Sequence, residues 1–123
     1  MLKPVVVVVD DQSFICDLAD RMLRSEYDVR PFTSESLAVK YIRENPVDLV
    51  FLDYEMPNMT GYEVLMDIRS NKKTSDLPVI FITGNTSERL ETEMRERGAT
   101  DYILKPINQN NLSVCLKKHL VKS

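Results

Sequence analysis

The most informative part of the chain is the stretch Val50-Phe51-Leu52-Asp53-Tyr54-Glu55-Met56-Pro57-Asn58-Met59-Thr60-Gly61, in which an apolar run leads into a turn. A short apolar run without alternation is typical of a strand that is buried on both faces of a parallel sheet. Asp53 comes where that strand leaves the core, and the Pro, Asn and Gly residues after it indicate a turn. Open α/β sheets bind ligands just outside the carboxyl ends of their strands. Asp53 is therefore a candidate site residue.

Five segments, including the one that ends just before Asp53, are predicted to be strands, and helical segments separate them. Val5 to Val9 contains only β-branched residues, whereas Tyr27 to Phe32 includes charges of the kind that an edge strand tolerates. The other predicted strands are Asp48 to Leu52, Pro78 to Ile82 and Asp101 to Leu104. Strands that alternate with helices favour an α/β fold with a parallel sheet and right-handed crossovers.

Five helices are predicted, one after each strand, from apolar residues that recur at helical spacing. The first has Ser13 as its N-cap, reaches about Arg24 and includes Phe14 in its inward face. The second opens at Ser34 and includes Leu37 in its inward face. Gly61 precedes the third helix.

The fourth predicted helix, roughly Thr86 to Arg97, carries many charges and little apolar surface. Only Leu90 and Met94 form an apolar stripe on it, and Gly98 follows as the expected C-terminal stop. A helix that buries so little is held weakly and shifts at low cost. We therefore expect this helix to be the most easily displaced element of the fold.

Length and composition narrow the class of protein. The 123 residues suit one domain with one sizeable core, so we expect residues 1–123 to form a single domain. A net charge of -3 and a single His argue against direct nucleic-acid binding. The sequence lacks an apolar stretch of the roughly 20 residues that a membrane span needs, and its start lacks a signal-peptide cleavage region. We expect a cytoplasmic protein without membrane contact.

The two cysteines and the single histidine suggest structural roles. Cys16 and Cys115 fall in predicted helices far apart in sequence. A disulfide between them stays open at this point, but two thiols packed as small apolar groups is the favoured interpretation for a cytosolic chain. His119 lies near the end of the last helix, where it is interpreted as a group that complements the helix dipole.

Reactive side chains follow four of the predicted strands. They are Asp10-Asp11, Asp53, Thr83 and Lys105. The carboxyl ends of parallel strands share one edge of the sheet, so these groups can converge. Three neighbouring carboxylates disfavour each other's ionisation, and a hard divalent cation relieves that repulsion. Oxygen-only ligation by few protein groups favours Mg²⁺.

This set of groups matches the needs of phosphoryl transfer to an aspartate. A metal ion and Lys105 neutralise the phosphoryl oxygens while the Asp53 carboxylate attacks, and Thr83 supplies a hydroxyl donor. Gly84 has no Cβ, so its backbone can approach a phosphoryl group closely.

The chain resembles the receiver domains of two-component response regulators, and in particular the chemotaxis regulators, over essentially its full length. The matching residues are Asp10-Asp11, Asp53 in its turn motif, Thr83-Gly84 and Lys105-Pro106. Any one of these is a weak signal, whereas all of them in order at strand ends are a strong one. The resemblance implies a flavodoxin-like, three-layer α/β/α fold with five helices and a five-stranded parallel sheet in the order 2-1-3-4-5.

The same resemblance implies the role of each residue. Asp53 accepts a phosphoryl group from a phosphohistidine of a sensor histidine kinase or a histidine phosphotransfer protein. Asp11 and Asp53 bind Mg²⁺ together with the backbone carbonyl of Glu55, while Asp10 acts largely through water. Lys105 pairs with the phosphoryl oxygens, and the Lys105-Pro106 bond is cis.

The implied output is a conformational switch. Thr83 turns to hydrogen-bond the phosphoryl group and Tyr102 turns inward with it; a half-buried core tyrosine is the equally weighted alternative for Tyr102. The surface of the fourth helix, fifth strand and fifth helix then changes, and a downstream partner or a second copy in a homodimer reads it. The sequence identifies neither that partner nor an effector domain.

The sequence leaves open the roles of Glu55 and Asn85 and allows two alternative functions. Glu55 and Asn85 lie where the family varies and where dephosphorylation is tuned, and a charged Glu55 either hinders or orients the attacking water. A Mg²⁺-dependent phosphatase or phosphotransferase of the haloacid-dehalogenase class requires an Asp-x-Asp arrangement, which Asp10-Asp11-Gln12 does not provide. A scaffold that is never phosphorylated would not need the complete set of reactive groups.

Overall fold

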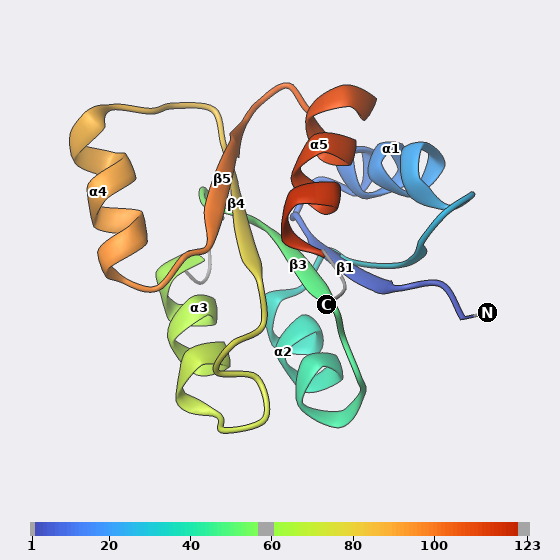
Figure 1. Ribbon diagram of the computed structural model, residues 1–123, viewed down its shortest axis with the longest axis horizontal. Helices are drawn as coiled ribbons and strands as arrows, with labels where there is room; N and C mark the ends of the chain where they lie inside the picture. Colours follow the sequence, from blue (N-terminus) through green and yellow to red (C-terminus); the bar gives the residue numbers. More distant parts are fainter. Residues whose placement is uncertain (1, 57–60, 121–123) are drawn as a thin grey trace.

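The computed structural model describes residues 2–56 and 61–120, so the part of the predicted turn at 57–60 lies outside the described residues. It shows a central sheet between two layers of helices (Figure 1). The five strands pair in parallel in the order β2-β1-β3-β4-β5. The predicted α/β class and the order 2-1-3-4-5 are confirmed.

The strands are β1 (Val5–Val9), β2 (Asp28–Phe32), β3 (Leu49–Asp53), β4 (Val79–Thr83) and β5 (Asp101–Leu104). β3 and β4 begin and end one residue later than predicted, and β2 begins one residue later. Asp53 pairs with Ile82, and Thr83 pairs with Leu104. Both candidate site residues are therefore the last residues of their strands, where the sheet itself fixes their backbones.

The helices are α1 (Ser13–Leu23), α2 (Glu35–Glu44), α3 (Gly61–Ser70), α4 (Glu88–Glu96) and α5 (Gln109–His119). α1 and α5 cover one face of the sheet, and α2, α3 and α4 lie on the other (Figure 1). Among the described residues, no helix combines the length and the apolar character needed to cross a membrane.

The apolar core lies on both faces of the sheet. Val7 and Val9 point into the cluster under α2 and α3, whereas Val6 and Val8 point into the cluster under α1 and α5. All four are fully buried, which explains why β1 shows no alternation in its sequence. Cys16 and Cys115 are free thiols in the second cluster, so the prediction that they pack as small apolar groups is confirmed.

Two predictions about inward-facing residues are wrong. Phe14 is 66% exposed and Leu37 is 59% exposed. The buried stripe of α1 passes through Cys16 and Ala19, and that of α2 passes through Ala38. Successive residues of a helix point about 100° apart, so Phe14 and Leu37 lie beside these stripes and face solvent.

The helix starts also differ in part from prediction. The N-cap of α1 is Gln12, whose side chain makes no capping hydrogen bond, and Ser13 is the first helical residue instead of the cap. Ser34 does cap α2, because its hydroxyl accepts from the backbone N–H of Leu37 at 3.3 Å. A serine before an apolar run thus predicts roughly where a helix begins, but it does not reliably predict which residue is the N-cap.

α4 is the least embedded helix, as predicted. Met94 is its one residue that is buried, and the helix is shorter than predicted because Ser87 caps it by accepting from the N–H of Leu90 at 3.1 Å. Gly98, with a φ of 109°, follows the end of the helix in the left-handed region that favours glycine. Because it buries so little, we expect α4 to shift relative to the sheet at low cost.

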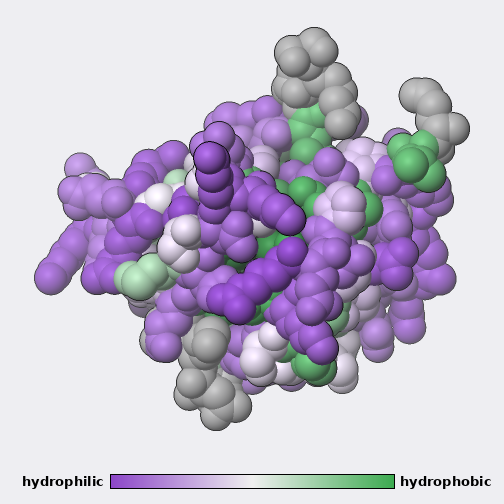
Figure 2. Space-filling model, turned by 90° about the horizontal axis from the view of Figure 1, so that it is seen from below, coloured by the Kyte–Doolittle hydropathy of each residue, from purple (hydrophilic) through white to green (hydrophobic). Residues whose placement is uncertain are grey.

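The direction of the strands separates two ends of the molecule. β4 and β5 run upward in Figure 1, and all the strands are parallel, so their carboxyl ends lie at the same edge of the sheet. The opposite end, viewed from below in Figure 2, is mostly hydrophilic, with apolar atoms between the polar side chains and at the edge of the view. The residues that follow the strands are consequently gathered at one end of the molecule.

Replacing Gly61 by Ala is expected to lower the free energy of unfolding by about 1 to 2 kcal/mol. A Cβ at this position would lie 2.5 Å from Cε1 of Phe81, a fully buried ring, so the core must shift. Gly84→Ala is the matched control, because its Cβ would meet only Oε1 of Glu55, at 3.7 Å. Urea unfolding measures both, and equal stabilities of the two variants would contradict the expectation.

Candidate functional site

The structure brings the predicted strand-end groups together. Nζ of Lys105 lies 3.1 Å from Oδ1 of Asp53, and the backbone N–H of Lys105 donates to the carbonyl of Thr83 at 2.8 Å. Carboxylate oxygens of Asp10, Asp11 and Asp53 all lie within 4.8 Å of one another. The Lys105-Pro106 bond is cis, as predicted. Residues from four separate strand ends thus form one acidic site with a lysine beside it.

The site is largely enclosed. Asp10 and Thr83 are fully buried, and Asp53 is 1% exposed, whereas Asp11 lies at the solvent-exposed rim. Burial of charged groups is unfavourable unless they are paired or bind a metal ion. Asp53 is paired with Lys105, so it is the burial of Asp10 that needs an explanation other than the stability of the fold.

Asp10 has one satisfied and one unsatisfied carboxylate oxygen. Oδ1 accepts from the backbone N–H of Gln12 at 2.9 Å, while buried Oδ2 has no hydrogen-bond partner among the described residues. Burial, with a smaller contribution from the Asp53 carboxylate, raises the pKa of Asp10 to about 6. A buried carboxylate oxygen without a protein donor fits a group that faces a cation, so the three carboxylates suit a hard, oxygen-preferring ion.

Asp53 and Lys105 are coupled by their contact. Burial raises the pKa of Asp53, although the N–H of Glu55 (3.1 Å from Oδ1) and the ammonium of Lys105 oppose that rise. Burial also acts to lower the pKa of Lys105, but the hydrogen bond and charge of Asp53 outweigh it and raise that pKa. Lys105 therefore stays positively charged at neutral pH, within reach of any group attached to Asp53.

The Thr83 hydroxyl is hydrogen-bonded to the backbone of Asn85. Its hydroxyl donates to the carbonyl of Asn85 at 2.9 Å and accepts from the N–H of Asn85 at 3.2 Å. The hydroxyl is thus engaged with the segment that leads into α4. A hydrogen bond donated by Thr83 to a group on Asp53 requires that the hydroxyl give up its donation to the carbonyl of Asn85.

Glu55 makes a contact that the sequence does not predict. Its Oε1 accepts from the backbone N–H of Gly84 at 3.0 Å. Glu55 follows β3 and Gly84 follows β4, and these strands are neighbours in the sheet. The strand order alone makes such proximity possible, but the direction of an exposed glutamate side chain is not encoded in the sequence pattern.

Tyr102 is partly buried on the β5 side that faces α4. Its hydroxyl donates a short hydrogen bond to the carboxylate of Glu91, and this bond raises the pKa of Tyr102. The half-buried position matches one of the two interpretations of this residue, while its inward movement stays a prediction. The contact ties β5 to the weakly embedded α4.

A family model described as a response regulator receiver domain matches residues 6–117 of the chain. The chain belongs to the response regulator receiver family. Members of this family act as signalling switches in two-component systems and interact with histidine kinases or phosphotransfer proteins and with effector domains. The residues of the acidic strand-end site are those that carry the resemblance to this family, and the fold is the one that the resemblance implies.

Comparisons with individual proteins agree with this assignment. The chain is 35% identical over 115 residues to a Vibrio cholerae protein named "Probable cyclic di-GMP phosphodiesterase". The aligned region covers 94% of this chain and 26% of that protein. The first curated relatives that it matches are longer proteins, of which the chain spans between 26% and 49%. The activity of such a whole protein therefore does not transfer to this receiver domain.

The solved structures that are similar to the chain are also receiver-like. Chemotaxis protein CheY4 of Vibrio cholerae superposes with a TM-score of 0.91 at 27% identity, over 96% of this chain and 99% of that one. The receiver domain of a sensor histidine kinase from Pseudomonas aeruginosa, with a magnesium ion coordinated in its active site cleft, gives a TM-score of 0.86 at 24% identity, over 96% and 98% of the two chains. The second likeness shows the fold alone.

Proposed function

We propose that residues 1–123 form a single cytoplasmic receiver domain in which Asp53 accepts a phosphoryl group from a phosphohistidine. The donor is a sensor histidine kinase or a histidine phosphotransfer protein. The observation that carries this assignment is the contact of 3.1 Å between Lys105 and the buried carboxylate of Asp53, beside an unpartnered oxygen of Asp10. A buried nucleophile with a fixed ammonium next to it is what phosphoryl transfer to a carboxylate requires.

Mg²⁺ is the cofactor that the donor set suits. Asp11, Asp53 and the backbone carbonyl of Glu55 would hold it, with Asp10 contributing largely through water. When bound, such an ion neutralises charge on the phosphoryl oxygens. The magnesium ion in the receiver domain of the Pseudomonas aeruginosa kinase supports this choice.

Three residues of the chain each have a separate role in the phosphoryl transfer. An oxygen of Asp53 forms the new O–P bond as the N–P bond of the phosphohistidine breaks, and the histidine nitrogen leaves with the bonding electrons. Lys105, already 3.1 Å from Oδ1 of Asp53, pairs with the transferred oxygens. The Thr83 hydroxyl exchanges its contact with the carbonyl of Asn85 for one with the phosphoryl group. Positioning and charge stabilisation supply the catalysis.

The switch works through the contacts of Thr83 and Tyr102. When Thr83 leaves Asn85, the segment before α4 loses one of its anchors. Tyr102 is bound to Glu91 of α4, so a shift of α4 changes the position of the tyrosine. The surface formed by α4, β5 and α5 is then altered, and an effector domain, a separate protein or a second copy of the chain reads it.

The domain performs self-phosphorylation and autodephosphorylation and does not turn over a separate substrate. It also does not contact nucleic acid directly or a membrane. A Mg²⁺-dependent phosphatase acting on other molecules is the alternative, and it would show as turnover of a phosphate ester well above the background rate. A scaffold of the same fold would show no phosphorylation.

Exposure to acetyl phosphate and Mg²⁺ tests the assignment. We expect a single phosphoryl group in the intact mass, lost on treatment with hydroxylamine, and beryllofluoride should shift the amide resonances of Gly84 and Tyr102. Transfer from a phosphorylated histidine domain should give the same modified residue. An unmodified mass together with an unchanged spectrum would reject the proposal.

Replacing Glu55 by Gln is expected to increase beryllofluoride affinity about twofold to fivefold at saturating Mg²⁺, as fits the removal of one solvent-screened charge. The carboxylate of Glu55 accepts from Gly84 and adds negative charge near the place where a phosphoryl group would introduce more. Glu44→Gln on the exposed end of α2 is the control. Titration followed by NMR measures both affinities, and weaker binding by Glu55→Gln would show that Glu55 assists the anion.

A further inference from the structure

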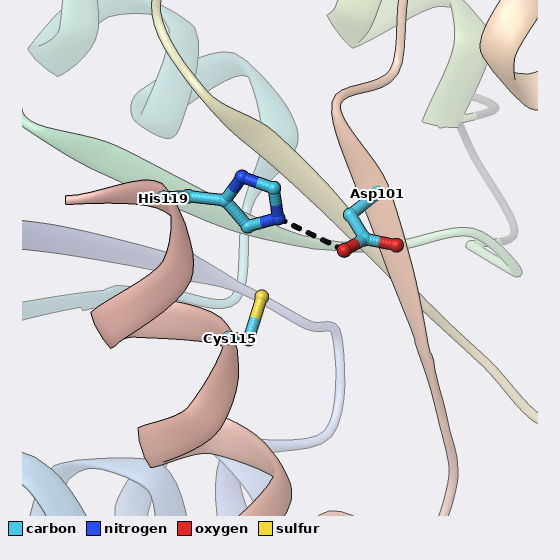
Figure 3. Close-up of side chains that lie close together, drawn as sticks. All are labelled: Asp101, Cys115 and His119. Atoms are coloured by element: carbon cyan, nitrogen blue, oxygen red, sulfur yellow. Dashed lines mark hydrogen bonds and ion pairs between the residues drawn. The ribbon is translucent and has the colours of Figure 1, made fainter. Parts of the chain in front are cut away.

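Three side chains outside the acidic site lie close together at the other end of β5. Asp101 is the first residue of β5, and Cys115 and His119 lie one helical turn apart near the end of α5 (Figure 3). Nε2 of His119 lies 2.9 Å from Oδ2 of Asp101, and the Cys115 thiol points toward the same space. The proposed phosphoryl transfer uses none of the three.

The distances between the donor atoms are close to those found between the ligands of one metal ion. One ligand atom of each residue lies within 4.8 Å of the others. A tetrahedral zinc ion with bonds of about 2.0 to 2.3 Å would hold its ligand atoms roughly 3.5 Å apart, so closure requires a movement of about 1 Å. Two ligands four residues apart on one helix face already have a spacing that zinc sites use.

The type of donor selects the metal. A thiolate, an imidazole and a carboxylate together suit zinc, whereas Mg²⁺ prefers oxygen ligands only. Three protein ligands leave a fourth position for water or another ligand. The cluster therefore differs in chemistry from the carboxylate site at the carboxyl ends of the strands, and the same ion would not favour both.

The neighbouring cations do not block the cluster. Nζ of Lys118 lies 3.8 Å from Oδ2 of Asp101, and the Lys118 side chain is 67% exposed. Arg95 approaches the other oxygen, Oδ1, at 3.6 Å, and its side chain is 57% exposed. Both are long and exposed, so Lys118 can move into solvent while Arg95 stays on Oδ1. A metal ion on Oδ2 would replace contacts that contribute little as surface ion pairs.

The residues are enclosed enough to form a defined site. The side chains of Asp101 and His119 are 18% and 14% exposed, and Cys115 is 6% exposed. Burial raises the pKa of the Cys115 thiol to about 12, so without a metal ion the thiol is protonated at neutral pH. Metal binding at Cys115 would therefore require the thiol to lose its proton.

We infer that Asp101, Cys115 and His119 form a zinc site that links the end of α5 to β5. Zinc would bind Oδ2 of Asp101, the sulfur of Cys115 and Nε2 of His119, with release of the thiol proton to solvent. The site lies on the α4, β5 and α5 side of the molecule but at the amino end of β5. Occupancy would hold β5 and α5 together independently of the state of Asp53.

Cobalt(II) is the probe that tests this inference, because a thiolate ligand gives it an intense charge-transfer absorption. The reduced protein is titrated with Co²⁺ in excess Mg²⁺, which occupies oxygen-only sites. We expect the thiolate band and the visible bands of four-coordinate cobalt to saturate at one equivalent and to disappear when Zn²⁺ is added. Zn²⁺ should also raise the unfolding temperature under the same conditions.

Variants separate the site from adventitious binding. Cys115→Ser should abolish the charge-transfer band, whereas Cys16→Ser, a change at the other buried thiol, should keep it. His119→Gln removes a proposed ligand, so it should weaken Co²⁺ binding by at least about 10- to 100-fold. That is the usual loss when a residue that only hydrogen-bonds to a metal ligand is changed. A missing band, or a band that survives in Cys115→Ser or is lost in Cys16→Ser, would overturn the inference.

Discussion

Asp53→Asn is expected to eliminate phosphorylation by acetyl phosphate and by a phosphohistidine donor. An amide is not a nucleophile toward phosphorus under these conditions, and the other two carboxylates of the site lie after β1 instead of beside Lys105. The fold should survive the change, because Asn has the same shape and replaces a carboxylate whose burial is unfavourable. The released ammonium of Lys105 is 28% exposed and can be solvated.

The measurement compares intact masses after equal exposure to each donor. Asp17→Asn is the matched control, since Asp17 is an exposed residue on α1 outside the site, and it should be phosphorylated like the parent protein. A phosphorylated Asp53→Asn protein would mean that another residue accepts the group. If neither Asp53→Asn nor the parent protein reacts while both remain folded, the receiver would act without phosphorylation.

The fold was predictable because its strongest signals are local. A run of five valines and the apolar segment before Asp53 have no polar alternation, which restricts them to central parallel strands. The strand order itself came from the family resemblance. The errors concern Phe14 and Leu37, because an apolar residue next to a buried stripe is indistinguishable in sequence from one within it.

The acidic site was predictable as a set of residues but not in its contacts. The parallel sheet brings together residues that follow its strands, so Asp53 and Lys105 could be expected at one edge. The contact of Glu55 with Gly84 depends on a side-chain direction, and that of His119 with Asp101 depends on how α5 lies along β5. Neither contact produces a periodic pattern of residues in the sequence. His119 was assigned only a helix-dipole role for this reason.

Asp10→Asn is expected to stabilise the metal-free protein and to weaken strongly its response to Mg²⁺. Asp10 has a pKa of about 6 in the folded protein against 3.8 as the reference value. The folded state therefore binds more protons at Asp10 between these values, so the contribution of Asp10 to stability is highest below about pH 4, falls as the pH rises to about 6 and is constant above that. At neutral pH the ionised carboxylate costs the fold about 1 to 3 kcal/mol, which Asn avoids while its oxygen keeps the contact with Gln12.

Urea unfolding at neutral pH, with and without Mg²⁺, measures both effects. In the parent protein Mg²⁺ should add stability, by about 2.7 kcal/mol at 100 times its dissociation constant, because only the folded state assembles the three carboxylates. Asp10→Asn should start from a higher value and gain far less, whereas Asp17→Asn should behave like the parent. A metal-free Asp10→Asn protein that is less stable than the parent would show that Asp10 supports the fold by a contact other than metal binding. The opposite signs expected for stability and Mg²⁺ response follow from one cause: the unpartnered Oδ2 of Asp10 is unfavourable in the empty fold and favourable only beside a cation.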